Sequence, residues 1–145
     1  MMFSLEVDSI FLEYGLRKVL QNVYLKSETG KVTGLLGRNG TGKSCLLKII
    51  FGELSAGGKS IRINGKPFLS DYRNPADLRY LPQRRFIPGS FSLKRIFNDF
   101  DLDFGDFIAE FHEFEKYYAT KIKNLSGGER RIVEIYTILT AKTKF

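Results

Sequence analysis

The chain has 145 residues, about one domain, and its composition of 43% hydrophobic and 27% charged residues excludes a disordered tail or a collagen-like repeat. One cysteine excludes an internal disulfide, one histidine argues against a His-rich metal site, and no apolar run reaches the roughly 18 residues that a membrane span needs. The net charge of +7 raises the question of nucleic-acid binding, but the Lys and Arg residues are spread along the chain, so most are expected to be solvated surface groups.

The first third of the chain is expected to contain three strands and a helix. Residues 4–12 and 19–26 are apolar-rich and suit β-structure, with a Tyr-Gly turn signal at residues 14–15 between them. Residues 31–36 form a short apolar run after a Thr-Gly pair, which is typical of a buried strand. The apolar run at residues 45–52 is expected to be a helix that stops at its final glycine.

The rest of the chain predicts two further strands and two helices. Residues 60–64 and 78–81 are expected to be strands, the first of them ending in an Asn-Gly turn. Aromatic residues fall at helical spacing over residues 104–118, with carboxylates on the opposite face, which predicts an amphipathic helix. A last helix is expected to begin at Ser126, because Ser126 and Glu129 have the spacing of a capping box.

The strongest local motif is residues 37–44, GRNGTGKS, which fit the phosphate-binding pattern G-x-x-x-x-G-K-[ST]. Its three glycines allow a tight turn whose amide groups point inward, and the following helix offers free N–H groups to an anion. Lys43 would place a positive charge on the terminal phosphates, and the hydroxyl of Ser44 could bind Mg²⁺. This P-loop predicts a nucleotide triphosphate site without fixing a class of enzyme. Its predicted nucleotide-binding residues are Gly37, Asn39, Gly40, Thr41, Gly42, Lys43 and Ser44.

A second glycine-rich helix start lies at residues 125–129, LSGGE. Taken alone, a Ser-Gly-Gly helix start is either an ordinary cap or another anion-binding helix terminus. Together with the P-loop, and with Gln83 between the two motifs, it resembles the signature motif of the ATP-binding-cassette (ABC) ATPases. The resemblance covers essentially the whole chain.

The resemblance implies an α/β fold, namely a P-loop NTPase core with an antiparallel β subdomain and a helical subdomain. Residues 1–145 would then be one partial ABC ATPase domain. Residues 1–83 would hold the β subdomain and the core up to the family's conserved glutamine. Residues 84–124 would form the helical subdomain, and residues 125–145 the signature motif and its helix.

The resemblance also implies roles for single residues. Tyr14 matches the aromatic residue that stacks on adenine, since stacking needs only a π face, although an ordinary exposed turn tyrosine is the alternative. Gln83 matches the glutamine that contacts Mg²⁺ and the attacking water. Lys43 and Gln83 are therefore the expected catalytic residues, and Ser44 and Gln83 the expected metal ligands. The residues expected to face a γ-phosphate held by the opposite subunit are Ser126, Gly127 and Gly128.

The sequence departs from the family pattern in two places. Cys45 stands where the family usually has threonine; its backbone amide can still bind nucleotide, but a thiol is a poor donor to the α-phosphate. We expect Cys45 to be alkylated by thiol reagents and protected by MgATP. No apolar strand followed by Asp-Glu, the Walker B element, lies after Ser126, and His112 precedes the signature, so it cannot be the family's switch histidine. A partial cassette with an incomplete central sheet, exposed strand edges and nucleotide binding without useful turnover is therefore expected.

The leading prediction for function is the ATP-binding subunit of an ABC transporter. The resemblance implies that the full-length parent binds ATP and Mg²⁺ and couples ATP hydrolysis to membrane transport. It also implies a second cassette in a head-to-tail dimer, an integral membrane permease as partner, and a cytoplasmic location at the inner face of the membrane. The residues that either dock the permease or belong to the subdomain core are Phe86, Phe91 and Phe97.

Two alternatives stay open at this point. A soluble ABC-type ATPase that acts on the ribosome or on DNA would suit the basic net charge, although no second cassette is present and nucleic-acid binding is not favoured. An inert remnant that binds nucleotide weakly or not at all is the other alternative. A gain in stability with MgATP that is lost in Lys43→Ala would separate the remnant from the other two.

Overall fold

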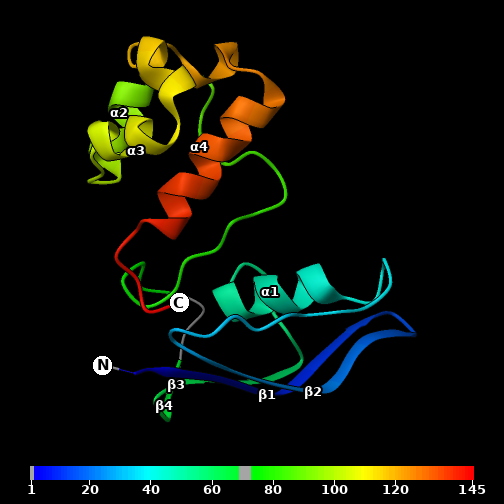
Figure 1. Ribbon diagram of the computed structural model, residues 1–145. Helices are drawn as coiled ribbons and strands as arrows, with labels where there is room; N and C mark the ends of the chain where they lie inside the picture. The colour runs from blue at the N-terminus through cyan, green and yellow to red at the C-terminus, as the bar shows by residue number, and fades with distance from the viewer. Residues whose placement is uncertain (1, 69–72) are drawn as a thin grey trace. The chain divides into compact units, whose positions relative to one another are not determined.

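The computed structural model describes residues 2–68 and 73–145, and its chain divides into two compact units. The first, here called the sheet unit, contains residues 1–79 and 143–145. The second, here called the helical unit, contains residues 80–142. Figure 1 shows the strands and the first helix in the sheet unit and the later helices in the helical unit.

The sheet unit is built on an antiparallel sheet with the strand order β2-β1-β3-β4. Its strands are β1 (Ser4–Tyr14), β2 (Arg17–Glu28), β3 (Gly58–Ile63) and the two-residue β4 (Lys66–Pro67). The first three confirm the predicted strands, and each is longer or begins earlier than the apolar pattern alone indicates. Alternate positions of β1 are buried, as expected for a sheet covered on one face.

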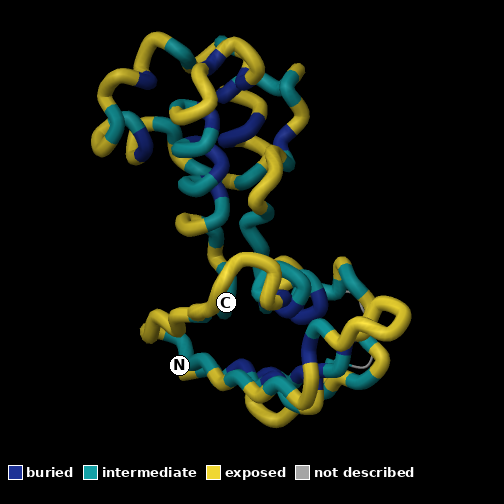
Figure 2. Tube along the Cα trace, turned by 90° about the vertical axis from the view of Figure 1, so that its right-hand side faces the viewer, coloured by how far each residue is buried: buried dark blue, intermediate teal, exposed yellow. Residues whose placement is uncertain are grey.

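Helix α1 (Lys43–Phe51) lies over one face of this sheet (Figure 1). It buries Leu46, Ile49 and Ile50, and buried positions occur along both the helix and the strands (Figure 2). Gly52 ends the helix in the left-handed conformation, with φ 88°, which confirms the predicted stop. The core of the unit is aliphatic and consists of Leu5, Val7, Ile10, Leu12, Leu20, Leu46, Ile49, Ile50, Ile61, Ile63 and Leu78.

The predicted strand at residues 31–36 is wrong, because this segment has no regular secondary structure. Val32 and Leu36 are exposed. A strand needs a neighbour to accept and donate its backbone hydrogen bonds, and within residues 2–68 and 73–145 no strand pairs with this segment. Most of the apolar run is therefore open to solvent, whereas Leu35 is half-buried against the core of the sheet unit.

Residues 78–81 do not form the predicted strand either, but the backbone on both sides of Leu78 is hydrogen-bonded to Phe145. Phe145 N–H donates to the carbonyl of Asp77 at 3.0 Å, and Arg79 N–H donates to the carbonyl of Phe145 at 2.8 Å. This alternation is that of a parallel pair. The Lys144 ammonium, 2.5 Å from the Asp77 carboxylate, closes the same junction.

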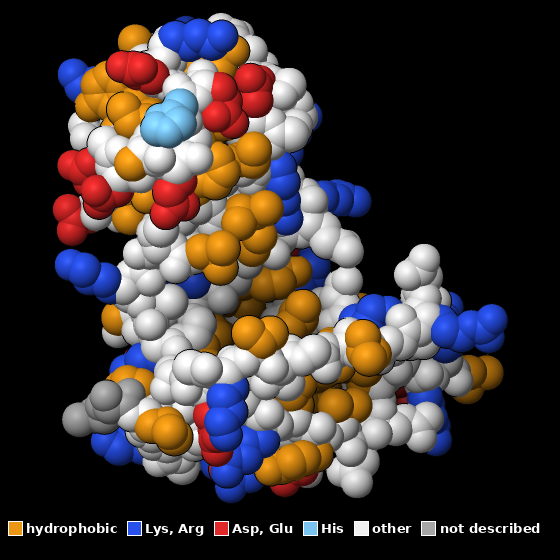
Figure 3. Space-filling view, viewed as in Figure 1, with side chains coloured by type: hydrophobic (Ala, Val, Ile, Leu, Met, Phe, Trp, Pro, Cys, Tyr) orange, Lys and Arg blue, Asp and Glu red, His pale blue; other side chains and the backbone are white. Residues whose placement is uncertain are grey.

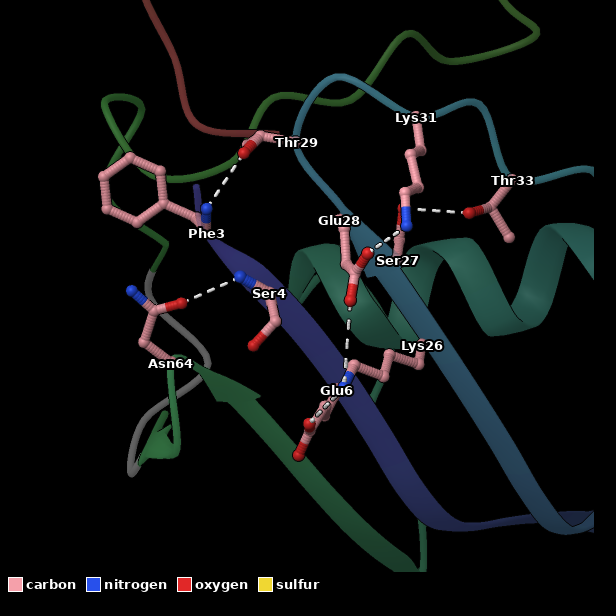
Figure 4. Close-up of polar contacts among 10 residues, drawn as sticks. All are labelled: Phe3, Ser4, Glu6, Lys26, Ser27, Glu28, Thr29, Lys31, Thr33 and Asn64. Carbon is pink, nitrogen blue, oxygen red and sulfur yellow. Dashed lines mark hydrogen bonds and ion pairs between the residues drawn. The ribbon is translucent and has the colours of Figure 1, made fainter. Parts of the chain in front are cut away.

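Side-chain contacts hold the start of β1 to its neighbours, as Figure 4 shows. Phe3 N–H donates to the hydroxyl of Thr29 at 2.9 Å, and Ser4 N–H donates to the side-chain oxygen of Asn64 at 2.8 Å. Asn64 has φ 48°, as the central residue of the predicted Asn-Gly turn requires. These contacts satisfy backbone donors at the end of the sheet.

The helical unit contains short helices packed around aromatic side chains. Its elements are α2 (Leu93–Asp99), α3 (Phe104–Glu110), the 3₁₀ turns η1 (His112–Tyr117) and η2 (Ile122–Asn124), and α4 (Gly127–Leu139). The fully buried rings of its core are those of Phe97, Phe107 and Phe114. Phe107 lies 5.0 Å from both Phe97 and Phe114, ring centre to ring centre. Of the described helices, none combines the length and apolarity that crossing a bilayer requires.

The single amphipathic helix predicted over residues 104–118 is wrong, because the chain breaks at Phe111 into α3 and η1. Phe111 has φ −126° and ψ 69°, and no glycine or proline marks the break. A continuous helix would add the carboxylate pair of Glu110 and Glu113 at i,i+3, where like charges cost about 0.2–0.5 kcal/mol. Figure 3 shows acidic side chains gathered over the part of the molecule that holds α2 and α3.

Candidate functional site

The P-loop leads directly into α1 and is open to solvent. Residues 37–41 are exposed and form a turn followed by a bend. Among the described residues, one backbone hydrogen bond involves an amide of this loop. In it, Thr41 N–H donates to the carbonyl of Arg38 at 3.4 Å. The loop is therefore neither extended nor buried, and its amides stay available to an anion.

Gly42 is the residue before α1 and has φ 92°, which is left-handed. A Cβ atom at this position would lie 2.9 Å from side-chain atoms of both Val19 and Leu20. Backbone conformation and crowding by β2 therefore both require glycine here. The helix that follows has no side-chain cap and no acidic residue in its first turn, so the positive end of its dipole is unneutralised.

Lys43 folds back over the loop. Its ammonium nitrogen donates to the carbonyls of Gly37 at 2.6 Å and Arg38 at 2.7 Å. The predicted phosphate-binding lysine thus lies against the same loop as the free amides. Ser44 and Cys45, which follow it, are half-buried in the first turn of α1.

Tyr14 belongs to the same unit and ends β1. It pairs with Arg17 across the hairpin, and its side chain is 56% exposed, so its ring face is open. Val19 and Leu20, a few residues further along β2, are the residues that a Cβ atom at Gly42 would meet. The start of β2 therefore lies beside the start of α1.

The signature residues lie in the helical unit, at the start of α4. Ser126 and Glu129 form the predicted capping box, since Ser126 N–H donates to the Glu129 carboxylate at 2.7 Å and Glu129 N–H donates to the Ser126 hydroxyl at 3.2 Å. These bonds from Ser126 hold the pKa of the Glu129 carboxyl below its ordinary value. Gly127 and Gly128 are exposed in the first turn.

Gln83 is exposed in the same unit and lies in a segment without helix or strand. The carbonyl of Pro82, just before it, accepts a hydrogen bond from the guanidinium of Arg131 at 2.9 Å, and the carbonyl of Ile87 accepts one from Arg130. Most Lys and Arg residues were expected to be solvated surface groups, and Arg130 is an exception, since it is only 7% exposed. The i,i+4 spacing of an arginine and a glutamate was the only signal that could have revealed this.

Of the three aromatic residues considered for docking, Phe97 is buried, at 1% exposure, and belongs to the core. Phe86 and Phe91 are half-buried against the same core. Arg95 stacks over the ring of Phe91, with its guanidinium carbon 3.8 Å from the ring centre. His112 is exposed. The core alternative therefore holds for Phe97.

The metal predicted at Ser44 and Gln83 depends on oxygen donors rather than on a cluster of acidic ligands. Among residues 2–68 and 73–145, no group of three or more His, Cys, Asp or Glu could hold a metal ion. A hydroxyl and an amide oxygen are hard donors that suit Mg²⁺, which usually takes its remaining ligands from water and phosphate. Each of the two donors, Ser44 in the sheet unit and Gln83 in the helical unit, is thus of a type that suits Mg²⁺.

A family model described as ABC transporter matches residues 20–145. The chain belongs to the ABC transporter family. It is 31% identical over 152 residues to the "Probable ABC transporter ATP-binding protein in ycf23-apcF intergenic region" of Cyanophora paradoxa, covering 94% of this chain and 61% of that protein. It is 36% identical over 91 residues to the "Manganese transport system ATP-binding protein MntB" of Bacillus subtilis (strain 168), covering 62% of this chain and 35% of that protein.

Solved structures of ABC proteins share the fold. A nucleotide-free ATP-binding cassette from an ABC transporter has a TM-score of 0.70 and 23% identity, covering 94% of this chain and 64% of that chain. A bacterial Atm1-family ABC exporter with ATP bound has a TM-score of 0.76 and 20% identity, covering 97% of this chain and 28% of that chain. These likenesses confirm the predicted fold class, an α/β P-loop NTPase core with an antiparallel sheet and a helical part.

Proposed function

We propose that this ABC-family chain binds ATP with Mg²⁺ at the P-loop and serves as the ATP-binding subunit of a transporter. The observation that carries the proposal is the exposed loop of residues 37–41, in which only Thr41 N–H has a backbone acceptor among the described residues, followed by a helix start without a side-chain cap. An anion would supply the missing cap, because amide dipoles and the Lys43 charge converge on one loop.

Nucleotide binding would begin with a change of partner for Lys43. Its ammonium, now bonded to the carbonyls of Gly37 and Arg38, would turn to the terminal phosphates. Ser44 and Gln83 would hold the magnesium ion, which neutralises phosphate charge when bound. Tyr14 would stack on the base, and Cys45 would contribute its backbone amide.

The longer protein would work with two partners. A second cassette would place its residues Ser126, Gly127 and Gly128 against the γ-phosphate, and a permease would give the pair its place at the cytoplasmic face of a membrane. Relatives described as ATP-binding proteins of manganese and zinc transport systems support this proposal. Hydrolysis of ATP is proposed for the longer protein, since this chain spans 61% and 35% of the two relatives compared above.

Thermal unfolding with and without MgATP tests the binding site. A ligand that binds only the folded state adds about 2.7 kcal/mol at a hundredfold excess over its dissociation constant, so the melting temperature should rise. Lys43→Ala should abolish the rise. Lys48→Ala is the matched control, because Lys48 lies on the same helix and pairs with Glu53 at 3.1 Å, away from the loop. A folded parent with no shift, or equal shifts in both variants, would refute the proposal.

Cys45 offers a second check, because it is the only cysteine of the chain and is half-buried in the first turn of α1. MgATP should slow its reaction with maleimide, since a nucleotide on the P-loop would cover the helix start. Mass spectrometry of the labelled fraction over time measures the effect. Equal labelling rates with and without MgATP in a sample that shows the thermal shift would contradict the placement of Cys45.

A further inference from the structure

The helical unit contains a buried carboxylate, that of Glu134 in the middle of α4, with an exposure of 0%. Arg130 Nε lies 3.3 Å from one of its oxygens, and Arg131 Nη1 lies 3.1 Å from the other. An unpaired carboxylate in such a place would be strongly unfavourable, so each oxygen has its own charged donor. Both arginines are brought to Glu134 by their helical spacing, at i,i+4 and i,i+3.

Each arginine also binds a second group outside the helix. Arg131 Nη2 donates to the carbonyl of Pro82 at 2.9 Å, and Arg130 Nη2 donates to the carbonyl of Ile87. These two carbonyls stand at the two ends of the segment that contains Gln83 and Phe86, which has no helix or strand of its own. A planar guanidinium can bridge a carboxylate and a carbonyl in a fixed geometry, which a lysine cannot do.

We propose that Glu134 is a positioning residue: it orients Arg130 and Arg131 so that they clamp residues 82–87 to α4. Gln83 and the helix that begins at Ser126 then move as one body. The proposal rests on the proposed function only in naming Gln83 and Ser126 as the groups that are positioned. It predicts that loss of Glu134 or Arg131 frees the segment while the rest of the unit stays folded.

A single tryptophan can report on this segment, because the chain has none. Phe86→Trp puts the reporter inside residues 82–87, at a half-buried position. Acrylamide quenching of its fluorescence, without nucleotide, should rise about twofold in Glu134→Gln and in Arg131→Met, since a released segment opens to solvent. Asp99→Asn is the matched control, because it removes an exposed i,i+4 partner of Arg95 in the same unit and should change nothing.

Two further variants separate positioning from simple stability. Arg131→Lys keeps the charge but offers one nitrogen, so its quenching should resemble that of Arg131→Met. The triple variant Arg130→Met, Arg131→Met, Glu134→Leu replaces the buried charges by apolar side chains, which commonly preserves stability. It should stay folded and still show the raised quenching.

If Glu134→Gln does not fold, Arg131→Met is the deciding variant. It is expected to fold, because Arg131 is only half-buried and Glu134 keeps its pair with Arg130. Quenching equal to that of the parent in folded Arg131→Met and in the triple variant would overturn the proposal. Neither result depends on nucleotide, so a failed ATP shift in the thermal assay leaves this test intact.

Discussion

Two helices of this chain begin at glycine-rich turns, and they begin in opposite ways. Helix α1 follows Gly42 with no side-chain cap, no carboxylate in its first turn and Lys43 at its head. Helix α4 follows Ser126, whose hydroxyl and amide are both engaged with Glu129. The first turn of α1 contains no carboxylate near the positive end of the helix dipole, whereas the first turn of α4 contains Glu129.

This contrast shows that glycine content does not by itself decide how a helix start would meet an anion. The two turns differ in whether side chains of the same turn bond to the backbone amides, as Ser126 and Glu129 do at α4. At α4 the Ser126 N–H already donates to the Glu129 carboxylate, so the γ-phosphate proposed for this turn would rely on Gly127, Gly128 and the Ser126 hydroxyl rather than on that amide. At α1 a phosphate would meet only amides and an ammonium group.

The largest expected effect is at Gly42. Gly42→Ala should destabilise the chain by about 2 kcal/mol, because a left-handed alanine costs 1–2 kcal/mol and its Cβ would crowd Val19 and Leu20. Gly128→Ala is the matched substitution in α4, where a Cβ meets nothing within 4 Å and φ is not positive, so it should be neutral or stabilising. Urea unfolding followed by circular dichroism measures both. Equal effects at the two glycines would remove the contrast.

A smaller loss is expected when the cap of α4 is removed. Ser126→Ala should cost about 1 kcal/mol, since an amide in the first turn loses its acceptor. Ser126→Asp restores an acceptor and should recover part of the loss. Urea midpoints compared under one set of conditions give the answer, and an alanine variant as stable as the parent would show that the box contributes nothing.

The smallest effect is a pH dependence at the same box. Hydrogen bonds from Ser126 lower the folded-state pKa of Glu129 below its ordinary 4.5, so the unfolded chain binds the proton more tightly. This contribution to stability is complete above pH 4.5 and is lost as the pH falls through the lowered folded pKa. The stability difference between the parent and Glu129→Gln should therefore shrink as the pH falls below 4.5. A constant difference would contradict it.

Local signals in the sequence were sufficient to predict the elements whose contacts lie within a few residues of one another. The hairpin of β1 and β2, the stop of α1 at Gly52 and the cap of α4 at Ser126 all depend on residues a few positions apart. The P-loop is likewise exposed and turned as its glycines predict. The assigned roles of Tyr14 and Gln83 stay predictions until ligand binding is measured.

The rest depended on partners that periodicity does not reveal. Residues 31–36 carry a strand pattern but lack a neighbouring strand among the described residues, and Phe111 breaks a pattern that is helical in sequence. Arg130 looks like surface charge until the carbonyl of Ile87 is brought beside it, 43 positions away in the chain. Such pairings are set by tertiary packing.

The backbone bonds between residues 76–79 and 144–145 have a consequence for how the chain is assembled. Residues 80–142 leave the sheet unit at one member of that parallel pair and return at the other. The helical unit is thus inserted between two paired segments of the sheet unit. Insertions at such a place can differ in length and sequence while the hydrogen bonds of the sheet unit are kept. Grafting another compact module of similar end-to-end spacing between Arg79 and Thr143 is the engineering use that this junction offers.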